Sequence, residues 1–153
     1  MERIPKINVE NKLLFVINPI SGGVDKTAFK NQLEAICIEK NVEPILLETT
    51  GKDDQTLIQQ QVDLHDPIAV VACGGDGTIN LVGGALLGKM VPLGIIPLGS
   101  ANGMATELLI PKDVDGSVEV LLEGKIIDMD VLEVNEEHLC FHLADVGFNA
   151  KLI

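Results

Sequence analysis

The stretch that decides the fold is residues 68–80, which read IAVVACGGDGTIN. Its first five residues are apolar and partly β-branched, as in a strand that is buried on both faces. Three glycines follow, and then apolar residues at helical spacing, Ile79, Val82 and Leu86. A buried strand that turns through glycines into a helix directs backbone N–H groups and the positive helix end toward one point. The stretch therefore predicts a cradle for phosphate.

The order of strand then helix repeats on both sides of this stretch. Short apolar runs predict three further buried strands, and each is followed by apolar residues at helical spacing. Parallel strands joined by helices form right-handed crossovers, so the pattern indicates an α/β fold with an open, mostly parallel sheet flanked by helices. The predicted strands are 13–17, 45–47, 68–72 and 93–96, and the predicted helices contain residues 29–37, 57–62, 79–86, 104–109 and 114–122.

The pattern changes after Gly124. Apolar and polar residues alternate over 127–131 and again over 139–143, which predicts two strands with one face in water and a turn at 135–137. Two strands alone are marginally stable and need a partner layer. We therefore expect an α/β domain at residues 1–125 and, at residues 126–153, the start of an incomplete β-rich second domain.

Composition excludes several classes of partner. The 153 residues carry 11 Lys and Arg against 23 Asp and Glu, a formal charge of −12, and they include no Trp or Tyr. Such a chain repels nucleic-acid backbones and lacks the aromatic rings on which bases stack, so no nucleic acid is expected as a partner. Any phosphate that it binds must be held by backbone amides or by a metal ion.

The cysteines and the apolar runs predict the compartment. Three cysteines without C-x-x-C spacing, and an N-terminus without an apolar signal core, predict a reduced, cytoplasmic protein. No apolar run approaches the ~18 residues of a membrane-spanning helix. No basic amphipathic stretch is present either, so any membrane contact is expected to be peripheral, at the inner face.

Three motifs occur in order at the ends of the first, third and fourth predicted strands. Residues 18–22 read NPISG, 74–78 read GGDGT and 97–102 read PLGSAN. Their order and spacing resemble the catalytic domain of diacylglycerol kinases, sphingosine kinases and bacterial lipid kinases. Residues 127–128 and 146–150 resemble later landmarks of that family, so the likeness spans residues 13–153. The GGDG core alone also resembles NAD kinases and phosphofructokinases.

The resemblance implies an N-terminal domain of the NAD kinase and diacylglycerol kinase type, which binds ATP with Mg²⁺, and a β-rich second domain that helps to hold the lipid. The implied reaction transfers the γ-phosphoryl group of ATP to a hydroxyl of diacylglycerol or of a sphingoid lipid. Carried over by position, the residues expected to contact the nucleotide are Asn18, Ser21, Gly22, Thr49, Thr50, Gly74, Gly75, Gly77, Thr78, Asn80 and Ser100.

Asp76 is the candidate catalytic and metal-binding residue. A carboxylate at the centre of a phosphate cradle repels naked phosphate, but it suits a site where Mg²⁺ bridges it to the phosphate or where it takes a proton from a hydroxyl. The structural interpretation is that Asp76 caps the helix that it begins. Three glycines exceed what a helix cap requires, which favours the functional interpretation.

Departures from the family pattern leave other functions open. Leu81 stands where the family often has Glu, and Gly103 and Thr106 stand where it usually has Asp and Arg. One alternative is an NAD kinase-like enzyme with a soluble acceptor, and another is a nucleotide-binding module without catalysis. We expect little or no kinase activity from these 153 residues alone. A homodimer is left open.

Three further patterns have a functional and a structural interpretation, and we favour the structural one for each. Residues 83–90 nearly fit Walker A spacing, but Met90 stands at the metal-binding position and Gly88 is typical of a helix end. Cys73 is a candidate reactive thiol or a small buried strand residue. The third pattern places potential metal ligands on one face of a strand: His138, Cys140 and His142.

Overall fold

The structure is a computed structural model that describes residues 11–135 and 138–141. In chain order its elements are β1 (Lys12–Ile17), α1 (Lys26–Glu39), β2 (Glu43–Glu48), α2 (Asp54–His65), β3 (Ala69–Gly74), α3 (Asp76–Leu86), β4 (Leu93–Pro97), α4 (Gly103–Glu107), α5 (Val114–Glu123), β5 (Leu132–Val134) and β6 (His138–Cys140). All four strands and all five helices predicted before Gly124 are confirmed, with boundaries that differ by a few residues.

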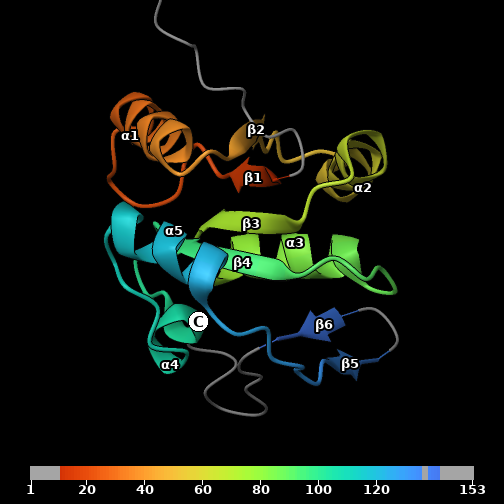
Figure 1. The fold of residues 1–153 in the computed structure, drawn as a ribbon. Helices are drawn as coiled ribbons and strands as arrows, with labels where there is room; N and C mark the ends of the chain where they lie inside the picture. Colours follow the sequence, from red (N-terminus) through yellow and green to blue (C-terminus); the bar gives the residue numbers. More distant parts are fainter. Residues whose placement is uncertain (1–10, 136–137, 142–153) are drawn as a thin grey trace, which may run out of the picture.

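The first four strands form one parallel sheet in the order β2-β1-β3-β4 (Figure 1). The two central strands, β1 and β3, are buried along almost their whole length. Their continuous apolar composition follows from this position, because helices cover both faces of the sheet. The prediction of an open parallel sheet flanked by helices is therefore confirmed.

Strand β1 shows how the two cores form. Successive side chains of a strand point to opposite faces of the sheet. Phe15 and Ile17 accordingly lie in an apolar cluster with residues of α1 and α5, while Leu14 and Val16 lie in a second cluster with residues of α2, α3 and α4. Figure 1 shows α1 and α5 on one side of the sheet and α2 and α3 on the other. The result is three layers with the sheet in the middle.

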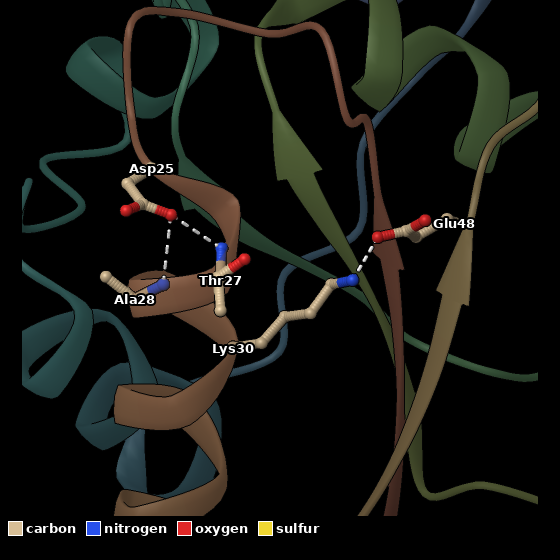
Figure 2. Close-up of polar contacts among 5 residues, drawn as sticks. All are labelled: Asp25, Thr27, Ala28, Lys30 and Glu48. Carbon is tan, nitrogen blue, oxygen red and sulfur yellow. Dashed lines mark hydrogen bonds and ion pairs between the residues drawn. The ribbon is translucent and has the colours of Figure 1, made fainter.

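Helix α1 begins at a side-chain cap. The Asp25 carboxylate accepts hydrogen bonds from the backbone N–H groups of Thr27 (2.9 Å) and Ala28 (3.2 Å), as Figure 2 shows. A cap of this kind stabilises a helix by about 1 kcal/mol. One turn later, Lys30 forms an ion pair with Glu48, the last residue of β2. This contact joins α1 to the carboxyl end of the edge strand.

The prediction of a strand at 127–131 is wrong. Residues 125–131 are irregular, and the strand that pairs with β6 is β5, at Leu132–Val134. Ile126 and Ile127 are exposed, and within the described residues no neighbouring strand pairs with this segment. Alternation alone does not make a strand, since each strand needs backbone partners. The predicted strand at 139–143 is confirmed in part by β6, and its last two residues lie outside the described ones.

The β5-β6 hairpin contacts helix α3. Phe141 is buried in the apolar cluster that also contains Val82, and a Cβ added to Gly83 would lie 2.5 Å from the Phe141 ring. The glycine thus lets the ring lie directly on the helix. The expected domain boundary near residue 125 remains a prediction.

The Walker A-like run is a helix end, as expected. Gly88 has φ +77°, a conformation that favours glycine, just after the last turn of α3. Met90 is fully exposed. Among the helices of the described ranges, none is long and apolar enough to cross a membrane.

Candidate functional site

The candidate site lies at the carboxyl edge of the sheet, between β1 and β3. These two strands are neighbours, yet β1 leads to α1 on one face and β3 leads to α3 on the other. Such a switch point leaves a crevice at the carboxyl ends of the strands, where open α/β sheets bind ligands. The Asn18 amide donates to the Cys73 carbonyl oxygen (3.1 Å) and the Leu98 amide donates to the Gly74 carbonyl oxygen (2.9 Å). All three sequence motifs therefore meet at one edge.

The glycine loop after β3 leads into the uncapped start of α3. Gly75 is the N-cap residue of α3 and no side chain caps this helix end. A Cβ added to Gly77 would have no heavy atom of the described chain within 4 Å, so the loop is open there. The Thr78 amide donates to the Gly75 carbonyl oxygen (3.0 Å). An uncapped helix N-terminus beside open space suits an anion, because the helix dipole is positive at this end.

Thr78 connects the loops of β1 and β3. The side-chain amide of Asn18 donates to the Thr78 hydroxyl oxygen at 3.5 Å, and Thr78 is almost fully buried. A Cβ added to Gly74 would lie 2.2 Å from this hydroxyl oxygen. Gly74 is therefore needed for the space occupied by Thr78, and two of the predicted nucleotide contacts, Asn18 and Thr78, lie next to each other.

Two other glycines let the three loops pack together. Gly22 has φ +55°, and a Cβ there would lie 2.2 Å from the Leu98 carbonyl oxygen. A Cβ added to Gly99 would lie 2.4 Å from the Cα of Gly75. The side chain of Asn102 holds the third loop closed, because it accepts from the Gly99 amide (2.9 Å) and donates to the Gly99 carbonyl oxygen (2.7 Å). Backbone packs directly on backbone around the site.

Asp76 caps a helix, but not the helix that it begins. Its Oδ2 accepts from the Gly103 amide (2.9 Å) and its Oδ1 accepts from the Met104 amide (3.0 Å), at the start of α4. The interpretation of Asp76 as the cap of the helix that it begins is therefore wrong, because the N-cap residue of α3 is Gly75. Each carboxylate oxygen can accept a further bond, since an ionised carboxylate has about four acceptor positions. The role of Asp76 toward Mg²⁺ or a hydroxyl proton stays a prediction.

The loop after β1 brings a positive charge that the sequence analysis did not single out. The Lys26 ammonium donates to the carbonyl oxygens of Ser21 (2.5 Å) and Val24 (3.3 Å). Asn18 and Ser21 shape the same loop, because the Asn18 side chain accepts from the Ile20 amide (3.1 Å) and the Ser21 hydroxyl donates to the Asn18 carbonyl oxygen (2.9 Å). A lysine in the first turn of a helix after a loop gives no sequence signal of its own.

The loop after β2 is organised by Asp54, which the sequence analysis also missed. Thr49 continues the ladder, since its amide donates to the Ile17 carbonyl oxygen (3.0 Å). The buried Asp54 carboxylate accepts from the amides of Thr50 and Gly51, both at 2.8 Å, and from the Thr50 hydroxyl at 3.1 Å. These bonds, led by the one from the Thr50 amide, hold the pKa of Asp54 below its usual value.

Two predicted contacts stand apart from the others. Asn80 and Ser100 are exposed, and no hydrogen bond of the described chain joins either side chain to another predicted residue. Ser100 shares a loop with Gly99, and Asn80 lies one turn into α3. In addition, no group of three or more His, Cys, Asp or Glu within residues 11–135 and 138–141 is arranged to hold a metal ion.

Cys73 is a small buried strand residue, as favoured from the sequence. It is completely buried, and burial raises the pKa of its thiol far above the ordinary value. Burial also raises the pKa of Cys37 to about 11. A thiol with a raised pKa is a poor nucleophile near neutral pH, because the thiolate is the reactive form. The pattern of potential metal ligands was His138, Cys140 and His142. Of these residues, His138 is exposed and His142 lies outside the described residues.

A separate apolar cavity of about 600 Å³ lies along β4 and the second half of α3. Its lining includes Leu86, Ile95, Met104, Ile127 and Phe141, but none of the glycines of the loop after β3. The candidate site is therefore distinct from this cavity.

Several known proteins resemble this chain in sequence. A curated relative from Escherichia fergusonii, named "probable lipid kinase YegS", is 41% identical over 134 residues, which cover 83% of this chain and 45% of the relative. A second, from Cronobacter sakazakii and named "probable lipid kinase YegS-like", is 38% identical over 87 residues, 54% of this chain and 29% of the relative. The chain thus spans less than half the length of these relatives.

Solved structures share the fold. The crystal structure of a diacylglycerol kinase from Bacillus anthracis superposes with a TM-score of 0.67 at 24% identity, over 84% of this chain and 45% of that one. The model of the diacylglycerol kinase catalytic domain matches residues 12–134, from the first residue of β1 to the last residue of β5. The chain therefore belongs to the diacylglycerol kinase catalytic domain family.

Proposed function

We propose that this chain is the nucleotide-binding part of a lipid kinase, which transfers the γ-phosphoryl group of ATP to a hydroxyl of diacylglycerol or of a sphingoid lipid. The observation that carries the proposal is the meeting of three glycine-bearing loops at the switch point of the sheet, beside the uncapped N-terminus of α3. Because the net charge is −12, the phosphates would be held by backbone amides and this helix end.

The predicted contact residues take distinct parts in this proposal. Gly74, Gly75 and Gly77 would let the phosphates approach the backbone, and Asn18 with Thr78 would close the other side of the crevice. Thr49 or Thr50 would reach the nucleotide from the end of β2. Ser21, Gly22, Asn80 and Ser100 would complete the surface of the pocket. Most of the catalytic effect would then come from positioning.

Asp76 fits a role with Mg²⁺. Proteins usually bind Mg²⁺ through one or two carboxylates together with substrate phosphates and water. Asp76 has acceptor positions left beside those used by the α4 amides, and it lies at the open glycine loop. When bound, the ion would neutralise charge on the phosphates. Asp76 is equally the candidate to take the hydroxyl proton while the lipid oxygen bonds to the γ-phosphorus and the bond to the bridging oxygen of ADP breaks.

The first test is calorimetric titration of the chain with Mg-ATP. We expect saturable binding by the wild type and weaker binding by Asp76→Ala. Asp113→Ala is the matched control, because Asp113 also caps a helix, through the Gly116 amide (2.7 Å), but lies outside the three motifs. Equal affinity of wild type and Asp76→Ala would remove Asp76 from the site, and absence of binding by the wild type would refute the proposal.

A nucleotide-binding role without catalysis is the second candidate. Leu81 packs in an apolar cluster and leaves no carboxylate there, and at Gly103 only a backbone amide meets Asp76. Radiolabelled ATP offered to a protein as long as the relatives, with diacylglycerol, sphingosine and NAD as acceptors, separates the cases. Labelled lipid supports the lipid kinase, labelled NAD supports a soluble acceptor, and binding without turnover supports the second candidate.

The setting of the reaction is part of the proposal. We propose a cytoplasmic protein that meets its lipid by peripheral contact at the inner membrane face, with lipid held mainly by the second domain. The cysteines Cys37, Cys73 and Cys140 are all free thiols, which suits a reducing compartment. The 153 residues alone should transfer little or no phosphate, and turnover equal to that of a protein as long as the relatives would contradict this. A homodimer stays open.

A further inference from the structure

We infer that Asp54 is a positioning residue for the nucleotide: its carboxylate holds the loop after β2 in the shape that presents Thr49 to ATP. The inference rests on the proposed ATP site and adds a residue that none of the three sequence motifs contains. Asp54 is the first residue of α2, and its side chain points back over the loop that precedes the helix.

Both oxygens of the Asp54 carboxylate accept hydrogen bonds from the loop. One oxygen accepts from the Thr50 amide (2.8 Å) and hydroxyl (3.1 Å), and the other accepts from the Gly51 amide (2.8 Å). Hydrogen bonds to an ionised acceptor are stronger than those between neutral groups. Asp54 is only 8% exposed, so little water competes for these bonds. The carboxylate therefore fixes the amides of two successive residues, while the Thr50 hydroxyl is shared with the Lys52 carbonyl oxygen (3.0 Å).

The loop needs such support because its backbone is unusual. Gly51 has φ +82° and Asp53 has φ +51°, both in the left-handed region that side-chain-bearing residues seldom adopt. Asp53 is the N-cap residue of α2 but makes no side-chain cap bond. A conformation of this kind persists only where neighbouring contacts hold it. Asp54 makes such contacts to Thr50 and Gly51, and the Thr50 hydroxyl also accepts from the Lys52 amide (3.2 Å).

The same bonds leave Thr49 available for a ligand. Its amide is fixed to the Ile17 carbonyl oxygen (3.0 Å), which places it beside the first residue of the NPISG motif. The half-buried Thr49 hydroxyl has no hydrogen-bond partner among residues 11–135 and 138–141, whereas the Thr50 hydroxyl is already bound by Asp54. Thr49 is therefore the threonine that we expect to touch the nucleotide, with Thr50 anchored behind it.

Removal of the Asp54 carboxylate should weaken nucleotide binding. In Asp54→Ala the loop becomes mobile and ATP must order it again, so we expect about ten-fold weaker Mg-ATP binding. Asp54→Asn retains one acceptor oxygen and should show an intermediate loss. Asp113→Asn is the control, since it makes the same chemical change at the cap of α5, away from the loops of the site.

The experiment measures the Mg-ATP dissociation constant by calorimetry and the melting temperature by circular dichroism for wild type and the three variants. The expected result is weaker Mg-ATP binding by the two Asp54 variants. Asp113→Asn should bind Mg-ATP as tightly as the wild type, although its melting temperature falls about as much as that of the Asp54 variants. Unchanged affinity in Asp54→Asn, which retains the side-chain shape, and in Asp54→Ala overturns this inference alone. A wild type that binds no ATP overturns the proposed function as well.

Discussion

Substitution of Gly99 by alanine tests the packing of the loops around the site. The added Cβ would lie 2.4 Å from the Gly75 Cα, 2.8 Å from the Gly75 nitrogen and 2.9 Å from the Asn102 side-chain oxygen. Carbon atoms in ordinary contact are about 3.5–4.0 Å apart, so the two loops must separate by about 1 Å. Two of these three contacts are with backbone, which cannot move aside as a flexible side chain can.

The expected effect on stability follows from that clash. Overpacking usually costs about 1–3 kcal/mol, and a backbone contact belongs in the upper half of that range. At roughly 4 °C per kcal/mol for a domain of this size, Gly99→Ala should lower the melting temperature by about 8–12 °C. The domain should still fold at room temperature, because stabilities of about 5–15 kcal/mol are usual.

Far-UV circular dichroism is the appropriate assay, since the chain has no Trp or Tyr for intrinsic fluorescence. Gly77→Ala is the matched control. A Cβ there meets nothing within 4 Å, and alanine favours helices over glycine by up to about 1 kcal/mol, so this variant should melt at or slightly above the wild-type temperature. If Gly99→Ala melts like Gly77→Ala, the close contact between the loops does not exist.

Three further results are expected. Asp76→Ala leaves two amides at the start of α4 without acceptors, so it should cost about 1–3 kcal/mol in urea unfolding and speed hydrogen exchange of those amides in NMR spectra. The pKa of Asp54 is lowered in the folded state, so its stabilising effect is present above the unfolded-state pKa of about 3.9 and is lost as the pH falls through the lower folded-state pKa. Urea unfolding of wild type and Asp54→Asn should therefore differ near neutral pH and converge in acid. Thiol labelling followed by mass spectrometry should modify the half-buried Cys140 first, and Cys73 only on unfolding, because its thiol is completely buried and its pKa is raised.

The sheet could be predicted from sequence because its strands are buried on both faces. A run such as 13–17 has no other stable place than the middle of a layered α/β fold. Strand β2 lies at the edge and is only half-buried, but its apolar centre at 45–47 was still sufficient. The prediction of a strand at 127–131 is wrong because an alternating pattern does not indicate whether a neighbouring strand exists to pair with it.

Whether a contact of the site could be predicted depends on how far apart its residues lie in the sequence. The meeting of the three motifs followed from strand order, because parallel strands end at one edge. The bond from Asp76 to the start of α4 joins residues 27 positions apart, and no spacing in the sequence indicates which amide a carboxylate reaches. Asp54 acts over only three or four residues, so the Thr-Gly segment before a helix that begins with Asp could have indicated it.

The position of β1 in the sheet also constrains the order of folding during synthesis. β1 leaves the ribosome before its partners, and it cannot be paired on both sides until β3, which begins 57 residues after it, has been made. The loop of Gly99 emerges later still, so the candidate site is completed only after most of the described chain exists. Under the proposed function, ATP would thus stabilise the domain by mass action only at the end of its folding. A nascent chain that stalls before β4 would carry an unfinished apolar edge, which is the form that chaperones recognise.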